Sequence, residues 1–316
     1  MLGEVLNPYY LQVLCFILIN IMLALSVYVP LSSGQLSLGS AGFMGIGAYT
    51  SALLAIHFEL PLYITILVGA LLAGVVGIIV GIPSLRLTGV YLAIATLGFG
   101  EVIRVFFINW ENVTKGSVGL TGIPQLGRSL LNVAKAAGLE PGAFGLRNNQ
   151  FVYLALAILL LIIVSVLLWF VIRQKNSRIG RAFASIQMDE KAAESMGINI
   201  TYYKVLAFAQ GAFIAGLAGA LFAHTIGFIS PADFSYHRAV EILIFTVFGG
   251  SELVIGSVFG AVILTLLPEL LRSVSDYRYI LYGIMLVILM AVRPQGILDV
   301  HLLLRMRGKR MKRGTG

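Results

Sequence analysis

The sequence predicts an all-α, polytopic integral membrane protein, and its composition, its apolar runs and the placement of its charges all indicate that class. Of its 316 residues 59% are hydrophobic and 11% charged, with a mean hydropathy of +0.94. A soluble domain carries about a quarter charged residues, so this chain has too few polar groups to cover a water-exposed surface. We expect a single transmembrane domain over residues 1–316, with about 8–10 helices and some broken or re-entrant glycine-rich segments.

The expected helices follow from nine apolar segments, several of them close to the length of about 20 residues that crosses a bilayer. They cover residues 9–31, 35–57, 61–82, 89–110, 151–172, 205–229, 238–249, 253–271 and 278–292. Two polar connections separate them, at 111–150 and at 173–204. An even number of crossings between the second connection and the C-terminus places both on the same side of the membrane.

The basic residues decide which side that is. Of the 22 Lys and Arg residues, 12 lie in two short stretches. These are Arg173, Lys175, Arg178, Arg181, Lys191, Arg293, Arg305, Arg307, Lys309, Arg310, Lys312 and Arg313. Basic residues beside spans mark the cytoplasmic side, which favours a topological role over nucleic-acid binding. Residues 173–204 are then a cytoplasmic loop, 293–316 a basic cytoplasmic tail in contact with the bilayer, and 111–150 an extracytoplasmic loop.

The second apolar segment contains an unusual mixture of serine, glycine and glutamine, "SSGQLSLGSAGFMGIGAYTS" (Ser32–Ser51). Polar, flexible backbone at membrane depth is tolerated where it is buried in protein or lines a wet cavity. A second glycine-interrupted element, "FGGSELVIGSVFGA" (Phe248–Ala261), lies in the other half, and paired interruptions of this kind indicate a transport path. We expect Gln35, Ser37 and Gly39 to line that path.

Charged side chains inside apolar segments add to the same hypothesis. Glu101 and Arg104 lie three residues apart in the fourth segment, and Glu241 follows Arg238 by the same interval. A charge near mid-bilayer costs roughly 2.5–3.5 kcal/mol, so each should face protein or water and find a partner. One interpretation is that Glu101, Arg104 and Glu241 line or gate the path in its outer half. The other is that they form ion pairs that fix helix packing.

No catalytic constellation is evident in the sequence. The four histidines lack metal-ligand spacing, and neither a GxSxG turn nor a phosphate-binding GxxxxGK[ST] loop occurs. We therefore expect a protein that is not an enzyme and that holds no cofactor or metal of its own.

The charged stretch "SRIGRAFASIQMDEKAAESMGINITYYKVLAF" (Ser177–Phe208) raises a different question, because it lies between two membrane-length segments. Its Ala, Glu, Lys and Met residues favour a short helix, and Gly197 is placed to end it. An exposed cytoplasmic helix of this kind is suited to docking another protein. The alternative is a solvated connector.

The sequence resembles the LivH/LivM-type permeases of ATP-binding-cassette (ABC) importers for branched-chain amino acids, and most closely the LivM branch. Seven stretches carry the resemblance in the family's order. They are "GQLSLGSAGFMGIGAYTSALL" (Gly34–Leu54), "SLRLTGVYLAIATLGFGEVIR" (Ser84–Arg104), "TKGSVGLTGIP" (Thr114–Pro124), "SRIGRAFASIQMDEKAAESMGI" (Ser177–Ile198), "AFIAGLAGALFAH" (Ala212–His224), "FGGSELVIGSVFGA" (Phe248–Ala261) and "RPQGI" (Arg293–Ile297). Two positions depart from the pattern: Lys115 stands where the family usually has glycine, and Glu252 interrupts a glycine-rich turn.

The resemblance implies a function for each part of the chain. The charged stretch would be the coupling helix that contacts an ATPase subunit. Its coupling residues would be Arg181, Asp189, Glu190, Ala192, Ala193 and Gly197. The implied partners are two ABC ATPases that hydrolyse ATP-Mg, a second, LivH-like permease chain and an extracytoplasmic binding protein, at a bacterial-type inner membrane.

Two alternatives to this function stay open. Urea and short amides are carried by permeases that resemble the LivM branch, so the cargo is not fixed by the resemblance. A secondary carrier driven by an ion gradient would suit broken helices and the intramembrane Glu101 and Glu241. A self-sufficient carrier, however, has no need of a coupling helix.

Overall fold

A computed structural model describes residues 7–84, 87–136, 147–250, 253–270 and 283. These residues form helices joined by short connections, with one two-stranded antiparallel pair, so the prediction of an all-α membrane protein is confirmed. The basic tail 293–316, Glu252 and, apart from Gly283, the expected segment 278–292 lie outside the described residues.

The elements follow the expected apolar segments closely. The α-helices are α2 (Pro8–Leu31), α3 (Ser40–His57), α4 (Leu62–Ser84), α5 (Val90–Asn109), α6 (Glu111–Thr114), α7 (Leu126–Ala136), α8 (Asn148–Lys175), α9 (Arg178–Met188), α10 (Glu190–Ser195), α11 (Ile200–Ile226), α12 (Tyr236–Gly249) and α13 (Val254–Leu270). The 3-10 helices are η1 (Gly116–Val118) and η3 (Pro231–Phe234), and the strands are β1 (Leu120–Thr121) and β2 (Phe228–Ile229).

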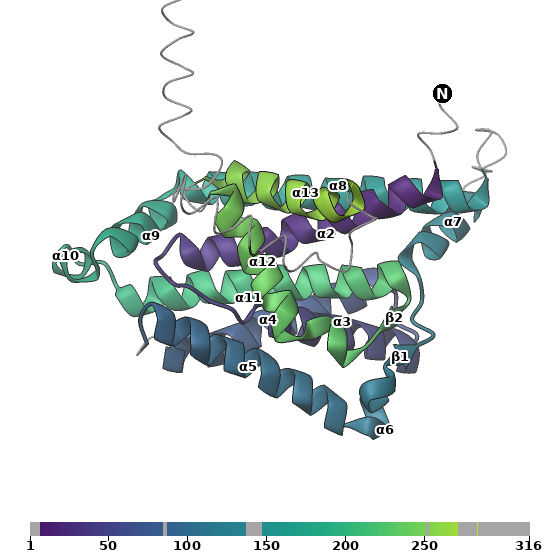
Figure 1. The fold of residues 1–316 in the computed structure, drawn as a ribbon, viewed down its shortest axis with the longest axis horizontal. Helices are drawn as coiled ribbons and strands as arrows, with labels where there is room; N and C mark the ends of the chain where they lie inside the picture. Colours follow the sequence, from purple (N-terminus) through teal and green to yellow (C-terminus); the bar gives the residue numbers. More distant parts are fainter. Residues whose placement is uncertain (1–6, 85–86, 137–146, 251–252, 271–282, 284–316) are drawn as a thin grey trace, which may run out of the picture.

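Five described helices are long and apolar enough to cross a membrane: α2, α4, α5, α8 and α11. They run along the long axis of the molecule, with α9 and α10 at one end and α6, α7 and the strand pair at the other (Figure 1). The described part of the 111–150 loop therefore lies at the opposite end from the charged stretch, as the crossing count predicts. At 14 residues, α12 is too short to span alone, and it packs back against α13.

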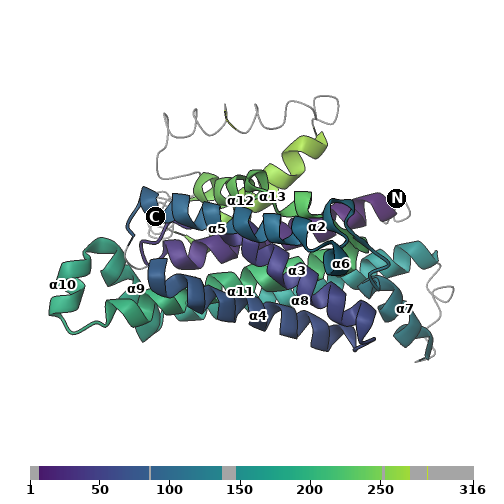
Figure 2. The same ribbon diagram turned by 90° about the horizontal axis from the view of Figure 1, so that it is seen from below.

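The centre of the bundle is formed by α11, which packs against α2, α3 and α4 (Figures 1 and 2). Contact between α3 and α11 is close because glycines on each helix face the backbone of the other helix. A Cβ atom on Gly47 would lie 2.0 Å from the Gly216 carbonyl oxygen, and one on Gly219 would lie 1.9 Å from that of Met44. Small residues permit such approach in lipid, where apolar burial alone does not hold helices together. Most of α3 is buried as a result.

The strand pair ties the described part of the 111–150 loop to the end of α11. Leu120 pairs with Ile229 and Thr121 with Phe228. Just before it, Lys115 ends α6 in the left-handed conformation, with a φ of 61°. Glycine adopts this conformation without steric cost, which gives a physical reason to expect glycine at this position.

Candidate functional site

The charged stretch folds into two helices, α9 and α10, each with a defined cap. Ser177 caps α9, and the Asp189 carboxylate accepts hydrogen bonds from the backbone N–H groups of Lys191 (2.9 Å) and Ala192 (3.1 Å) at the start of α10. Gly197, with a φ of 81°, ends α10 as predicted. Its N–H donates to Glu194, and the N–H of Ile198 donates to Ala193, which is the Schellman pattern. Asp189 and Gly197 therefore fix the length of α10.

The outer surface of α10 combines charge with two protruding methionines. Ala193 is buried, whereas Ala192, Lys191 and Glu194 are exposed. Met188, the last residue of α9, and Met196, directly after α10, flank that helix and are 88% and 83% exposed. Methionine is flexible and polarisable, which suits a protein-docking surface. Sequence reasoning missed both residues, because an isolated methionine gives no periodic signal.

A buried lysine connects α10 to the membrane-spanning bundle. The Lys204 ammonium lies 2.5 Å from the Glu190 carboxylate, and Lys204 as a residue is 5% exposed. Sequence reasoning placed Lys204 in the cytoplasmic loop, but α11 begins at Ile200 and contains it. The signal that could have found this contact was a single lysine at the start of an apolar segment, a short distance after the acidic residues Asp189 and Glu190.

The broken segment between α2 and α3 continues this connection. The Gln35 amide donates to the Lys204 carbonyl oxygen (2.9 Å) and to the Ser33 hydroxyl (2.9 Å). The Leu38 N–H donates to the Thr96 hydroxyl on α5 at 2.9 Å. A series of contacts thus runs from the Glu190 carboxylate to the Lys204 ammonium, and from the Lys204 main-chain carbonyl to the Gln35 amide in the segment 32–39. We name this series the Glu190–Lys204–Gln35 relay.

The other predicted path residues lie in the same segment. Ser37 is 5% exposed and its hydroxyl accepts from the Gly39 N–H at 3.2 Å. Gly39 is the N-cap residue of α3, and a Cβ atom there would lie 3.2 Å from the Phe43 ring. The structure therefore brings Gln35, Ser37 and Gly39 together between α11 and α5, and their contact with cargo stays a prediction.

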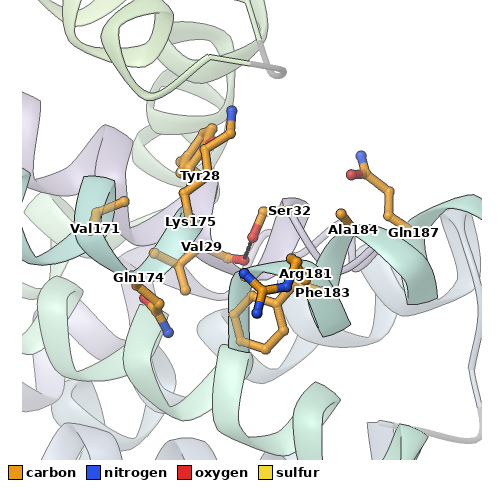
Figure 3. Close-up of a pocket in the computed structure, with 11 residues that line it drawn as sticks. Tyr28, Val29, Ser32, Val171, Gln174, Lys175, Arg181, Phe183, Ala184 and Gln187 are labelled. Carbon is orange, nitrogen blue, oxygen red and sulfur yellow. Dashed lines mark hydrogen bonds between the residues drawn. The ribbon is translucent and has the colours of Figure 1, made fainter. Parts of the chain in front are cut away.

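Arg181 lies apart from the other predicted coupling residues, in the first turns of α9. It lines a cavity of about 170 Å³ between α2, α8 and α9, which we name the α9 pocket (Figure 3). Its lining is Tyr28, Val29, Ser32, Val171, Gln174, Lys175, Gly180, Arg181, Phe183, Ala184 and Gln187. The sequence grouped Arg181 with the residues of α10, but its surroundings are those of the bundle end.

Glu101 joins α5 to α12. One carboxylate oxygen accepts from the Arg104 Nε at 2.8 Å, as the spacing predicts, and the other accepts from the Tyr236 N–H at 2.8 Å. The two charged side chains are 27% and 30% exposed. Tyr236 begins α12, so the carboxylate also stabilises the positive end of that helix.

The second intramembrane pair joins three helices. Arg238 contacts Glu241 at 2.7 Å, as expected, and also donates to the Asn20 side-chain oxygen on α2 at 2.6 Å. The Asn20 amide donates in turn to the Thr265 hydroxyl on α13 at 2.9 Å. Both intramembrane pairs therefore fix helix packing, while a role of Glu101, Arg104 and Glu241 in lining the path stays a prediction.

His224 forms another interhelical contact that sequence reasoning missed. It is fully buried, with one ring nitrogen 2.8 Å from the Ser51 hydroxyl on α3 and the other 2.8 Å from the Pro124 carbonyl oxygen. The ring thus ties the end of α11 to α3 and to the 111–150 loop. Within the described residues, no three His, Cys, Asp or Glu side chains lie close enough together to hold a metal ion.

Glu101→Leu is expected to lower the free energy of unfolding by about 1–3 kcal/mol, because Arg104 and the Tyr236 N–H both lose their acceptor. The thermal unfolding midpoint in detergent should fall by several degrees, and Glu101→Leu/Arg104→Leu should recover part of the loss. Glu111→Leu, at an exposed acid on α6, is the control. A midpoint for Glu101→Leu equal to that of the control would show that the bridge between α5 and α12 contributes nothing to stability.

Comparison with known proteins identifies relatives along almost the whole chain. Residues 9–290 match the family model described as "Branched-chain amino acid transport system / permease component". The chain is 36% identical over 295 residues to the high-affinity branched-chain amino acid transport system permease protein LivM of Escherichia coli, covering 91% of this chain and 69% of the relative.

More distant relatives are permeases as well. The chain is 28% identical to the ribose import permease protein RbsC of Haemophilus influenzae, over 87% of this chain and 80% of the relative. It is 28% identical to the LivH permease protein of Salmonella typhimurium, over 62% of this chain and 61% of the relative. No solved structure gives a significant match.

The match over residues 9–290 includes all the described helices apart from Pro8, the first residue of α2, and it includes the broken segment and α9–α10. The 36% identity extends over 91% of the chain, far more than one motif would explain. The chain is therefore a multi-pass membrane protein that belongs to the family of permease components of branched-chain amino acid transport systems.

Proposed function

We propose that this chain is the permease subunit of an ABC importer at a bacterial inner membrane, where ATP hydrolysis in separate ATPase chains drives uptake of branched-chain or related neutral amino acids. The observation that carries the proposal is α10, a capped helix held outside the bundle and flanked by exposed Met188 and Met196. A permease with such an exposed helix can dock a separate ATPase chain, which would supply the energy for transport.

The partners follow from the same proposal. The sequence has no phosphate-binding GxxxxGK[ST] loop, so ATP-Mg would be bound and hydrolysed by two ATPase subunits that dock on α10. The relatives include both LivM and LivH permeases, which supports a heterodimer of this LivM-like chain with a LivH-like chain. An extracytoplasmic binding protein would deliver the cargo to the end of the bundle that carries β1, β2 and α7.

The relay gives the proposed mechanism a physical route. Movement of α10 on closure of the ATPases would act on Lys204 through Glu190, and on the segment 32–39 through Gln35. The Leu38–Thr96 hydrogen bond extends the route to α5. Alternating access requires only that ATPase closure favour one permease conformation by a few kcal/mol, which is a small bias for several such contacts to carry.

The cargo is proposed from the relatives' names and not from a binding pocket. The relative with 36% identity is named for branched-chain amino acids, while a relative at 28% is named for ribose. The fold thus serves more than one cargo, and urea or short amides are the alternative within the same class. Both intramembrane carboxylates, Glu101 and Glu241, are paired with arginine, which gives no support to a carrier driven by protons or sodium.

Co-purification of the tagged chain from its native membrane tests the proposal. Wild type is compared with Glu190→Lys/Gly197→Asp, which reverses the charge at the start of α10 and places a side chain at a φ of 81°. Glu111→Lys on α6, at the opposite end of the bundle, is the matched charge control. We expect an ATPase with wild type and control and at least tenfold less of it with the α10 variant.

Uptake by the assembled complex separates the cargoes. We expect labelled leucine to enter proteoliposomes in the presence of ATP, binding protein and the complete complex, and labelled urea not to enter. Uptake of urea alone would overturn the amino acid cargo and leave the ABC class intact. If wild type recovers no ATPase and the purified chain alone moves solute under an ion gradient, the ABC importer is excluded.

A further inference from the structure

We propose that a groove beside α7 binds an acyl chain of a phospholipid from the membrane leaflet at that end of the bundle. The groove has a volume of about 940 Å³ and is lined by the connection between α3 and α4, the start of α4, α7, and parts of α8 and α11. It lies at the end opposite α10 (Figures 1 and 2), and its lining includes no residue of the relay or of the intramembrane ion pairs. The proposal requires only that the chain spans a membrane, so it is independent of the proposed function.

The lining of the groove offers a ligand hydrocarbon contacts and few polar partners. Most of it consists of leucine, isoleucine and valine, including Leu217 and Leu221 on α11. Among the described lining residues only Glu59 carries a charge, and it is exposed in the connection before α4. The Ser129 hydroxyl already donates to the Gln125 carbonyl oxygen at 3.4 Å. A polar solute would lose its water here with few hydrogen bonds in return, whereas a hydrocarbon chain has none to lose.

The helix α7 is amphipathic, and its apolar face lines the groove. Leu126, Leu130 and Val133 follow one another at helical spacing, and all three belong to the lining. Arg128 and Lys135 lie on the opposite face and are exposed. Leu126 is buried, whereas Val133 is 68% exposed although it belongs to the apolar face. A helix of this kind lies in the plane of the membrane interface, with its apolar face toward the acyl chains and its basic residues among the headgroups.

The groove is continuous with helix faces that are suited to lipid. Every exposed side chain of α4 from Ile64 to Ile82 is apolar, and Leu67 belongs both to that face and to the groove. The exposed side chains of α8 from Ile158 to Phe170 are apolar apart from Ser165, whose hydroxyl bonds to its own helix. Lipid can contact faces without charge, whereas the exposed face of α5 carries the Glu101–Arg104 pair and requires protein or water. The apolar phase beside α4 and α8 is therefore the source of the ligand.

Photolabelling of the full chain in lipid bilayers tests where the acyl chain lies. The probe is phosphatidylethanolamine with a diazirine in one acyl chain, and peptide mass spectrometry locates the labels. We expect labels on α11 at Leu217 and Leu221, which an acyl chain in the groove would contact. Labels confined to the exposed faces of α4 and α8 would show ordinary contact with the bilayer and overturn the proposal. This measurement uses wild type and so does not depend on how any variant folds.

Native mass spectrometry of the chain in detergent then measures whether phosphatidylethanolamine is retained. Leu159→Trp adds an indole to the α8 wall of the groove. Leu161→Trp is the matched control, because it makes the same change on the other face of α8, outside the lining and 51% exposed. We expect wild type and control to retain the lipid and Leu159→Trp to retain it about fivefold less. The thermal unfolding midpoint verifies that both variants are folded.

Two further outcomes would overturn the proposal. Equal retention by Leu159→Trp and Leu161→Trp would place the retained lipid outside the groove. Stronger labelling of Leu217 and Leu221 by a diazirine fatty acid than by the phospholipid would assign the groove to a free fatty acid.

Discussion

Gly219→Val is expected to prevent the chain from folding correctly in the membrane. A Cβ atom at this position would lie 1.9 Å from the Met44 carbonyl oxygen and 2.7 Å from the carbonyl carbon, so the new side chain would meet backbone that cannot rotate away. Overpacking a core against side chains already costs about 1–3 kcal/mol, and a clash with backbone allows less relaxation. We expect the yield of monodisperse protein after size-exclusion chromatography to fall at least tenfold.

Two further substitutions test whether the loss of yield comes from the clash at Gly219. Gly98→Val on α5 is the matched control, because a Cβ at Gly98 meets nothing within 4 Å, and it should leave the yield unchanged. Gly219→Ala should give an intermediate yield. A Gly219→Val protein that elutes and melts as wild type does would mean that α3 and α11 do not approach as closely as the structure describes.

Lys204→Met is expected to lower ATP-driven uptake about tenfold while leaving the assembled complex intact. The change keeps the length and apolar stem of the side chain and removes the ammonium that holds Glu190. The Glu190 side chain is 46% exposed, so water can hydrate its carboxylate once the partner is lost, and the stability cost should be small. Uptake and ATP hydrolysis are both measured in proteoliposomes: uptake reports on coupling, and ATP hydrolysis reports on the integrity of the complex.

The matched control is Arg178→Met, which removes an exposed charge from α9 and leaves both the relay and the outer surface of α10 in place. Lys204→Arg keeps a cation within reach of Glu190 and should retain most of the uptake. ATP hydrolysis should continue in Lys204→Met without proportional transport. Uptake equal to wild type in that variant would show that the relay is not required for coupling.

Much of the architecture follows from patterns that are local in the sequence. The apolar segments predict the spanning helices because length and hydropathy are sufficient for that purpose. Gly197 could be assigned to the end of α10 because a left-handed residue after a helix favours glycine. The Glu101–Arg104 and Arg238–Glu241 pairs were predictable because residues at i and i+3 share a helix face.

The contacts that organise the candidate site are not local and could not be predicted in this way. Asn20 bonds to Thr265 across 245 residues, and Gln35 bonds to the Lys204 carbonyl across 169. A single sequence contains no period or spacing that relates such pairs. Lys204 illustrates the consequence: its charge indicated a loop, whereas burial of its stem and the pairing with Glu190 place it inside α11.

The burial of α3 has a consequence for how the chain is made. This helix carries glycine, serine and tyrosine, packs mainly against α4, α5 and α11, and depends on α11 for its closest contacts. The end of α11 at Ile226 is translated 169 residues after the end of α3 at His57, a delay of roughly 10–30 s at typical elongation rates. During that interval Gly47 and the Met44 carbonyl group on α3 lack the close neighbours, Gly216 and Gly219, that α11 later supplies. A nascent chain arrested in α8 should therefore be a preferred substrate of membrane proteases and insertion chaperones, and completion of α11 should end that vulnerability.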